Sequence, residues 1–129
     1  MCPLTDVGRD HFATDLIGLS IVEFDNANAA LGVGDSSTAF AKAQTDLQAA
    51  SNKLRKGMEA GFPDVPSAAN ILRFRALFGT SEANFAWEEW ATFNALASGT
   101  MLNRKVESLG TKTAAQSFQL TVTITVNNP

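Results

Sequence analysis

Residues 117–126 have the sequence SFQLTVTITV, in which large apolar residues alternate strictly with polar ones. Because successive side chains of a β-strand point to opposite faces of the sheet, a period of two is typical of a strand with one buried face. This segment therefore predicts a half-buried strand. The positions expected to point into a core are Phe118, Leu120, Val122, Ile124 and Val126.

Segments upstream carry the same signal. Residues 70–78 (NILRFRALF) and 85–94 (FAWEEWATFN) also alternate with a period of two, and a turn containing glycine and serine follows each of them. Further strand candidates are residues 29–33, 53–58 and 100–107. Several short strands joined by short turns are typical of an antiparallel β-sandwich.

The N-terminal segment has a helical pattern instead. In residues 5–17 (TDVGRDHFATDLI), apolar residues such as Phe12 and Leu16 recur four positions apart and make one stripe. Thr5 is a candidate N-cap and Gly18 is a natural stop. The stripe predicts a helix that packs its apolar side against the rest of the protein.

We therefore predict a mainly β fold, an antiparallel β-sandwich preceded by one N-terminal α-helix. The 129 residues are expected to form a single domain, with the helix in residues 1–18 and the β domain in residues 28–126. Residues 35–63 are ambiguous, and we predict a loop with a short helical turn before the strand near 53–58.

Two short motifs invite a ligand-binding interpretation, but turns account for both. GVGD at residues 32–35 lacks the lysine and the spacing of a phosphate-binding loop, so we predict a turn in which glycine supplies a positive φ. FDNANA at residues 24–29 offers oxygen ligands for Ca²⁺ but lacks the spacing of an EF-hand, and Asx turns explain the same residues.

The composition bounds the function. A net charge of −3 and a pI of about 5.0 make nucleic acid an unexpected partner. The only cysteine, Cys2, allows no internal disulfide, and with the only histidine, His11, it leaves too few ligands for a structural zinc site. No apolar run approaches the ~20 residues of a membrane-spanning helix. We expect a protein of a reducing cytoplasm that contacts no membrane and binds no metal or cofactor. We also expect that it is not an enzyme.

Residues 85–93 (FAWEEWATF) place two adjacent carboxylates, Glu88 and Glu89, between Trp87 and Trp90. Neighbours in a strand point to opposite faces, so the two carboxylates are not expected to act as a catalytic acid–base pair. Glu89 is expected to share a face with Trp87 and, if buried, to need a cationic partner. The two tryptophans are expected to face opposite ways, so that one is buried and the other is an exposed anchor for a protein contact. The candidate partners of Glu89 are Arg73, Arg75 and Arg104.

Basic residues gather at Lys53, Arg55 and Lys56, whereas acidic residues dominate before residue 50. We interpret the basic group as a solvated face or as the complement of an acidic patch on another subunit. The candidate protein-contact residues are therefore Trp87, Glu88, Glu89, Trp90, Lys53, Arg55 and Lys56.

Five landmarks follow one another along the chain: TDVGRDHFATDLIG, ANAALGVGDSSTAF, TDLQ, FAWEEWATFNALASGTMLNRKV and QLTVTITV. In this order and spacing they resemble small virion proteins of tailed bacteriophages, a group that includes tail-collar and fibre-type modules. The fourth landmark is similar to that group's segment EIGLFNA-x-GGT-L-x-R. The group commonly has glycine where this chain has Ala91, and a glycine there would favour a β-bulge.

The resemblance implies a structural component of a tailed-phage virion, associated with the tail, collar or fibre. Such a protein assembles in the host cytoplasm and acts through contacts with other virion proteins and copies of itself. A capsid decoration protein on the head surface is the first alternative. The second is a glycan- or receptor-binding β-sandwich in which Trp90, beside Glu88, stacks on a sugar.

Overall fold

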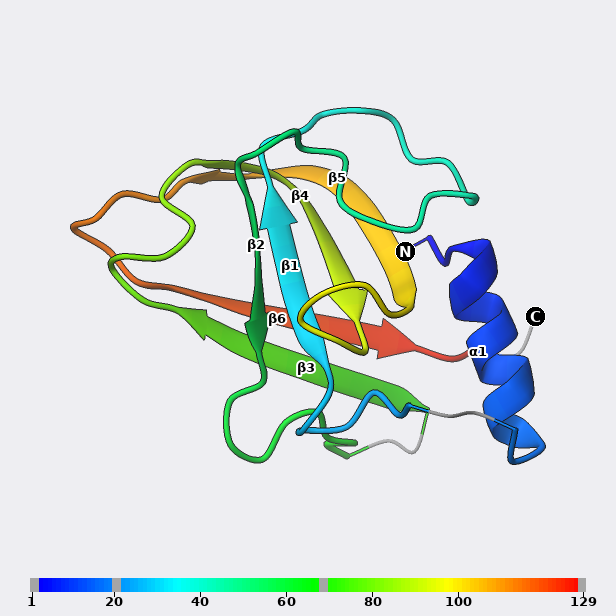
Figure 1. The fold of residues 1–129 in the computed structure, drawn as a ribbon. Coiled ribbons are helices and arrows are strands. Elements are labelled where there is room, and N and C mark those ends of the chain that lie inside the picture. Colours follow the sequence, from blue (N-terminus) through cyan, green and yellow to red (C-terminus); the bar gives the residue numbers. More distant parts are fainter. Residues whose placement is uncertain (1–2, 20–21, 68–69, 128–129) are drawn as a thin grey trace.

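The computed structural model describes residues 3–19, 22–67 and 70–127. These residues form one helix and six strands, and the predicted fold class is confirmed: it is mainly β, with two antiparallel sheets packed together after an N-terminal helix (Figure 1). The elements are α1 (Asp6–Leu16), β1 (Ala30–Gly34), β2 (Lys53–Gly57), β3 (Ile71–Phe78), β4 (Ala86–Phe93), β5 (Met101–Thr111) and β6 (Phe118–Thr125).

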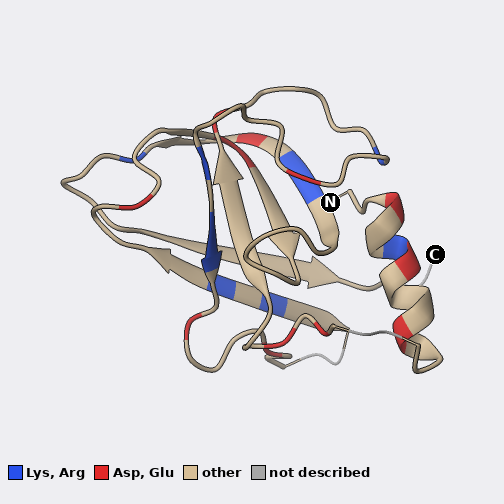
Figure 2. Ribbon diagram, viewed as in Figure 1, with Lys and Arg blue, Asp and Glu red and all other residues tan. Residues whose placement is uncertain are grey.

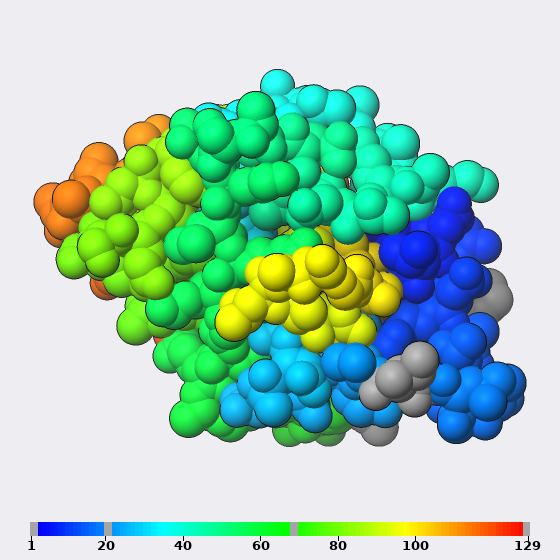
Figure 3. Space-filling model, viewed as in Figure 1, coloured from blue at the N-terminus to red at the C-terminus, as the bar shows by residue number. Residues whose placement is uncertain are grey.

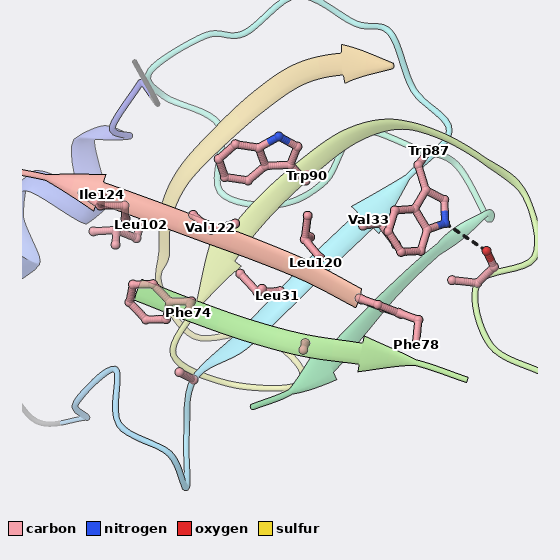
Figure 4. Close-up of a cluster of buried hydrophobic side chains, with 13 residues drawn as sticks. Leu31, Val33, Phe74, Phe78, Trp87, Trp90, Leu102, Leu120, Val122 and Ile124 are labelled. Atoms are coloured by element: carbon pink, nitrogen blue, oxygen red, sulfur yellow. Dashed lines mark hydrogen bonds between the residues drawn. The ribbon is translucent and has the colours of Figure 1, made fainter. Parts of the chain in front are cut away.

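One sheet has four strands in the order β2-β1-β4-β5, and the other pairs β3 with β6. The apolar faces of the two sheets enclose the core shown in Figure 4. The alternation in β6 is confirmed for Leu120, Val122 and Ile124, which are buried. The prediction for Val126 is wrong, because it lies beyond the last residue of β6 and is 55% exposed.

The two edges of the β3–β6 sheet differ. Beside β3, the chain at residues 59–64 adds backbone hydrogen bonds: Glu59 N donates to Arg75 O at 2.9 Å, and Asp64 and Arg73 exchange two bonds of 2.9 Å. Beside β6, the described residues supply no further strand. The two-stranded sheet is therefore covered by the chain at its β3 edge and open at its β6 edge.

Helix α1 is attached mainly by its N-terminal end. Thr5 is the N-cap, as predicted, and its hydroxyl accepts from Gly8 N at 3.0 Å. Gly8 lies against β5, where an added Cβ would be 2.8 Å from the Cα of Leu102. Gly18 ends the helix with a φ of +75°.

The predicted apolar stripe of α1 does not face the core. Gly8 is the helix residue described as buried, whereas Phe12 is 38%, Leu16 87% and Ile17 69% exposed. Gly8, Phe12 and Leu16 are spaced four residues apart and so share one side of the helix, but this side meets β5 only at its N-terminal end, at Gly8. The stripe is therefore increasingly exposed toward the C-terminal end of α1. Figure 1 shows α1 beside the sandwich, near the end of β6.

The chain between β1 and β2 crosses the outer face of the four-stranded sheet as an irregular loop, which we call the cover loop (residues 36–50). It contains a hydrogen-bonded turn at residues 42–43 and no helical turn, so that part of the prediction is wrong. In Figure 3 the cover loop and the turn after β4 hide most of this sheet face. The strand predicted near residues 53–58 is confirmed as β2.

The predicted turn at GVGD is also wrong, because Gly32 and Gly34 lie within β1 without a positive φ. Their role is to leave space beneath the cover loop. A Cβ on Gly32 would lie 2.8 Å from the Phe93 ring and 2.9 Å from Leu47, and one on Gly34 would meet the carboxylate of Glu89.

Replacing Gly34 by alanine should destabilise the protein by about 1–3 kcal/mol, because the methyl group would overpack the space shared by Glu89 and Ala49. The matched control is Gly57→Ala in β2, where an added Cβ has no atom within 4 Å, and its effect should stay within about 0.5 kcal/mol. Urea denaturation measures both free energies of unfolding. Equal losses in the two variants would contradict the close packing beneath the cover loop.

Candidate functional site

Strand β4 carries FAWEEWATF through the middle of the four-stranded sheet, between β1 and β5. Its pairing with β5 is irregular. Trp87 lies opposite Gly110, and Glu89 lies opposite Val106, so three residues of β5 face the single residue Glu88. Such a bulge interrupts the regular alternation of side chains between the two faces.

Because of the bulge, Trp87 and Trp90 both lie in the core between the sheets (Figure 4). They are 1% and 6% exposed, and the Trp87 ring meets the rings of Phe78 and Phe118 edge-on at 4.9 and 5.1 Å. The predictions that the tryptophans face opposite ways, and that Glu89 shares a face with Trp87, are therefore wrong. Neither tryptophan is exposed as an anchor.

Glu89 points to the outer face of the sheet, beneath the cover loop. Arg104, on β5, donates to it through Nη2 at 2.6 Å and through Nε at 2.8 Å, and both side chains are completely buried. The prediction of a cationic partner for a buried Glu89 is confirmed, and of the three candidate arginines the partner is Arg104. Glu88 is only partly buried and accepts from the Ser108 hydroxyl at 3.3 Å.

The Glu89–Arg104 pair also holds the cover loop. The Glu89 carboxylate accepts from the backbone N–H groups of Gln48 and Ala49, each at 3.0 Å. Arg104 donates to the Gln44 side chain at 3.1 Å and to the Thr38 carbonyl at 2.9 Å. Because its oxygens are committed and shielded from solvent, the carboxylate is built to hold a loop rather than to reach a substrate.

Arg55 anchors the opposite side of the same face. Its guanidinium lies 3.5 Å from the centre of the Phe93 ring, donates to the carbonyls of Ala95 and Ser98 at 2.9 and 2.8 Å, and pairs with Asp46 of the cover loop at 3.1 Å. Arg55 therefore links β2, the turn after β4 and the cover loop.

The other basic residues of this region are paired within the chain. Lys53 lies 3.4 Å from Asp46, and Lys56 lies 2.7 Å from Glu82. Figure 2 shows the basic residues of β2 and β3 close to acidic segments of the same chain. Local ion pairs therefore engage Lys53, Arg55 and Lys56. Their charges are less available to an acidic patch on another subunit.

One carboxylate is linked to the core through a tryptophan. The indole N–H of Trp90 donates to Glu107 at 3.0 Å, and this hydrogen bond, together with Lys105 at 3.4 Å, holds the pKa of Glu107 below its ordinary value of 4.5. The hydrogen bond from Trp90 is the larger cause, and partial burial of the carboxyl group opposes it.

The most prominent exposed feature surrounds α1. We call it the α1 surface, and it consists of the partly or largely exposed apolar residues Val7, Phe12, Leu16, Ile17, Leu19 and Val22.

Two grooves run along the flanks of α1. A groove of about 520 Å³ lies between Val7, Leu19 and Val22 on one side and the turn after β4 on the other. A second groove, of about 400 Å³, lies between Phe12 and the core residue Phe74. We did not predict this site, although the apolar stripe in residues 5–17 was its signal; we assigned the stripe to the core.

The Asp25 motif forms an Asx turn, as predicted: its carboxylate accepts from the backbone and side-chain N–H groups of Asn28 at 3.0 and 2.8 Å. In the described part of the chain, no three His, Cys, Asp or Glu side chains gather in the manner of a metal-ion site. Within those same residues, α1 is too short and too polar to cross a bilayer.

In comparisons with known proteins, no protein-family model matches the chain, and neither does any curated protein.

Glu89→Gln should lower the free energy of unfolding by about 3–5 kcal/mol, because it leaves Arg104 buried without a counter-charge. The matched control is the adjacent Glu88→Gln, which alters a partly exposed side chain and should cost less than about 0.5 kcal/mol. Urea denaturation gives both values. Hydrogen exchange adds a local readout, since the amides of Gln48 and Ala49 should lose protection in Glu89→Gln alone. A stable Glu89→Gln with protected amides would contradict this role.

Glu107 should stabilise the protein in a pH-dependent way. Because its pKa is lower in the folded than in the unfolded state, its contribution is present above about pH 4.5 and is lost as the pH falls through the folded pKa. Comparison of the wild type with Glu107→Gln at a series of pH values should show a difference of less than about 1 kcal/mol at pH 6, since the carboxylate is partly exposed, and this difference should shrink as the pH falls below about 4.5. A difference that stays the same across this pH series would contradict the assignment.

Proposed function

We propose that the protein is a structural component of a tailed-phage virion, associated with the tail, collar or fibre, and that it acts through contacts with other proteins rather than through catalysis. The observation that carries this proposal is the α1 surface. Leu16, Ile17 and Leu19 are 87%, 69% and 64% exposed, and they adjoin one another at the end of the helix.

An apolar surface of this kind favours an assembly role. Burial of a leucine or isoleucine side chain contributes roughly 1.5–3 kcal/mol, so a partner that covers several of them gains substantial binding free energy. Exposed apolar patches rimmed by polar residues mark protein contacts. Here the rim is supplied by the acidic residues of α1, Asp6, Asp10 and Asp15 (Figure 2).

The rest of the site supports the same proposal. The two core tryptophans lie between the sheets, and the buried Glu89–Arg104 pair holds the cover loop, so the Glu89 carboxylate is committed to the fold. The sequence resemblance to tail-collar and fibre-type modules supplies the class of partner, namely other virion proteins.

The glycan-binding alternative depended on an exposed tryptophan. Trp90 is 6% exposed, and its N–H is bonded to Glu107, so it offers no ring face to a sugar. We do not propose that function. A capsid decoration protein would also bind through an apolar protein contact. It would differ from a tail, collar or fibre protein in its copy number per virion.

The test is quantitative mass spectrometry of purified particles of the phage that encodes this chain. About six or twelve copies, as rings around a tail axis provide, would support the tail, collar or fibre position. Hundreds of copies would instead assign the protein to the head surface or to a repeated component of the tail tube. Absence from the particle would overturn a structural role.

Leu16→Asp combined with Ile17→Asp should abolish incorporation into particles without unfolding the protein, because both side chains are exposed and their replacement costs less than about 0.5 kcal/mol each. The matched control is Leu77→Asp, which changes a leucine that is 43% exposed on β3 and does not belong to the α1 surface or to the grooves beside it. Thermal unfolding verifies the fold, and particle composition gives the result. Normal incorporation of the double variant would exclude the α1 surface as the contact.

A further inference from the structure

The edge of β6 has no strand beside it among the described residues. Val126 N donates to the directly opposite Asn70 O at 2.8 Å. This bond shows which residues of β6 direct their backbone groups to β3 and which direct them away from it. In an antiparallel pair, every second residue directs its backbone groups to the partner strand. The even-numbered residues of β6 therefore bond to β3. The residues that direct their N–H and C=O groups to the open edge are Gln119, Thr121, Thr123 and Thr125.

This assignment is supported by the other edge of the same sheet. There the outward-directed residues of β3 include Arg73 and Arg75, and both bond to residues 59–64. The chain thus covers the edge of β3 with its own backbone. It provides no such strand for β6 among the described residues.

The β6 edge also lacks the usual protection against pairing. Natural edge strands carry charges, prolines, bulges or short lengths that discourage added strands. β6 is eight residues long, pairs with β3 without a register shift, and has the sequence FQLTVTIT, which contains no charged residue, proline or glycine. In Figure 2 it is uncharged along its whole length, unlike its neighbour β3.

Space is available beside the end of this strand. A groove of about 870 Å³ lies between residues 123–127 on one side and Leu4, Arg9 and Phe12 on the other. Its walls include the exposed Val126 and the partly exposed Phe12. A strand added to β6 would continue along this groove.

We propose that two copies of the chain pair through their β6 edges, antiparallel and around a two-fold axis at Val122. The two sheets then become one continuous sheet in the order β3-β6-β6-β3. The axis places Thr121 opposite Thr123 of the second copy, so every outward-directed backbone group of one edge meets its complement on the other.

The side chains match in the same register. Leu120 lies opposite Ile124 of the second copy, and Val126, in the groove, lies opposite Phe118 of the second copy. Apolar residues therefore meet apolar residues on the core side, and threonines meet threonines on the outer side, which are favourable cross-strand pairs. No like charges oppose each other, because β6 has no charged residue.

These features favour a second copy over another occupant. A strand of the same length, alternation and lack of charge satisfies the edge and matches its side chains, and β6 itself is such a strand. A two-fold contact also pairs both β6 edges at once. The groove residues Phe12 and Val126 add apolar surface that a second copy can bury. The proposal does not depend on the virion role.

The register allows a test by charge pattern. In Thr121→Lys/Thr123→Lys, each new lysine faces a lysine of the second copy, and the dimer dissociation constant should rise about tenfold. In Thr121→Lys/Thr123→Glu, each lysine faces a glutamate, and dimerisation should be retained or strengthened. Both variants change the same two exposed positions, whose backbone groups point away from β3 and whose side chains lie opposite Arg75 and Arg73 of that strand. Sedimentation velocity at low salt measures the association, and thermal unfolding verifies the fold of each variant.

A wild-type dimer with weakened Lys/Lys and retained Lys/Glu association establishes the β6 contact and its register. Hydrogen exchange of the purified protein should show the Thr121 and Thr123 amides protected in the wild-type dimer. A wild-type chain that is monomeric at about 100 μM overturns the proposal, since a micromolar dimer would be populated there. A dimer that survives Lys/Lys, or that Lys/Glu disrupts equally, also overturns it. Because the purified chain is used, these results are separate from incorporation into particles.

Discussion

The buried pair of Glu89 and Arg104 is the interaction on which the outer layer of the protein depends. The cover loop has neither helix nor strand, so its backbone groups need partners from elsewhere. The pair supplies three of these hydrogen bonds, at Thr38, Gln48 and Ala49, and makes a fourth to the side chain of Gln44. Desolvation of two charges is costly, and here it is offset because almost every bonding group of the pair is satisfied. The glycines of β1 then provide the room that the pair and the loop require.

The sequence predicted the strands well because alternation is a local signal. β3 and β6 carry it without interruption, and the buried residues of β6, Leu120, Val122 and Ile124, were all among those predicted to point inward. β4 carries the same signal, yet its pairing with β5 is bulged. The bulge places Trp87 and Glu89 on opposite faces of the sheet. A register shift is a property of two strands together, so the sequence of one strand does not reveal it.

The candidate site was predicted only in part, for a related reason. The need of Glu89 for a cation follows from burial of a charge, but the choice of Arg104 over Arg73 and Arg75 depends on which strand is its neighbour. The apolar stripe of α1 was recognised and assigned to the core, because amphipathic helices usually pack that way. Here that side of the helix meets β5 only at Gly8, whose missing side chain allows the close approach, and the stripe residues one and two turns later are left exposed.

The pairing of β3 with β6 joins segments that are separated by the whole of β4 and β5. Such non-local pairs form slowly, because the entropy of closing the intervening chain is lost before the contacts are gained. The two-stranded sheet is therefore expected to assemble late, onto a β4–β5 hairpin that is already formed. During that interval the uncharged β6 segment stands without its partner in a crowded solution. The yield of this protein is then governed by the speed at which one chain completes its own sheet before meeting another.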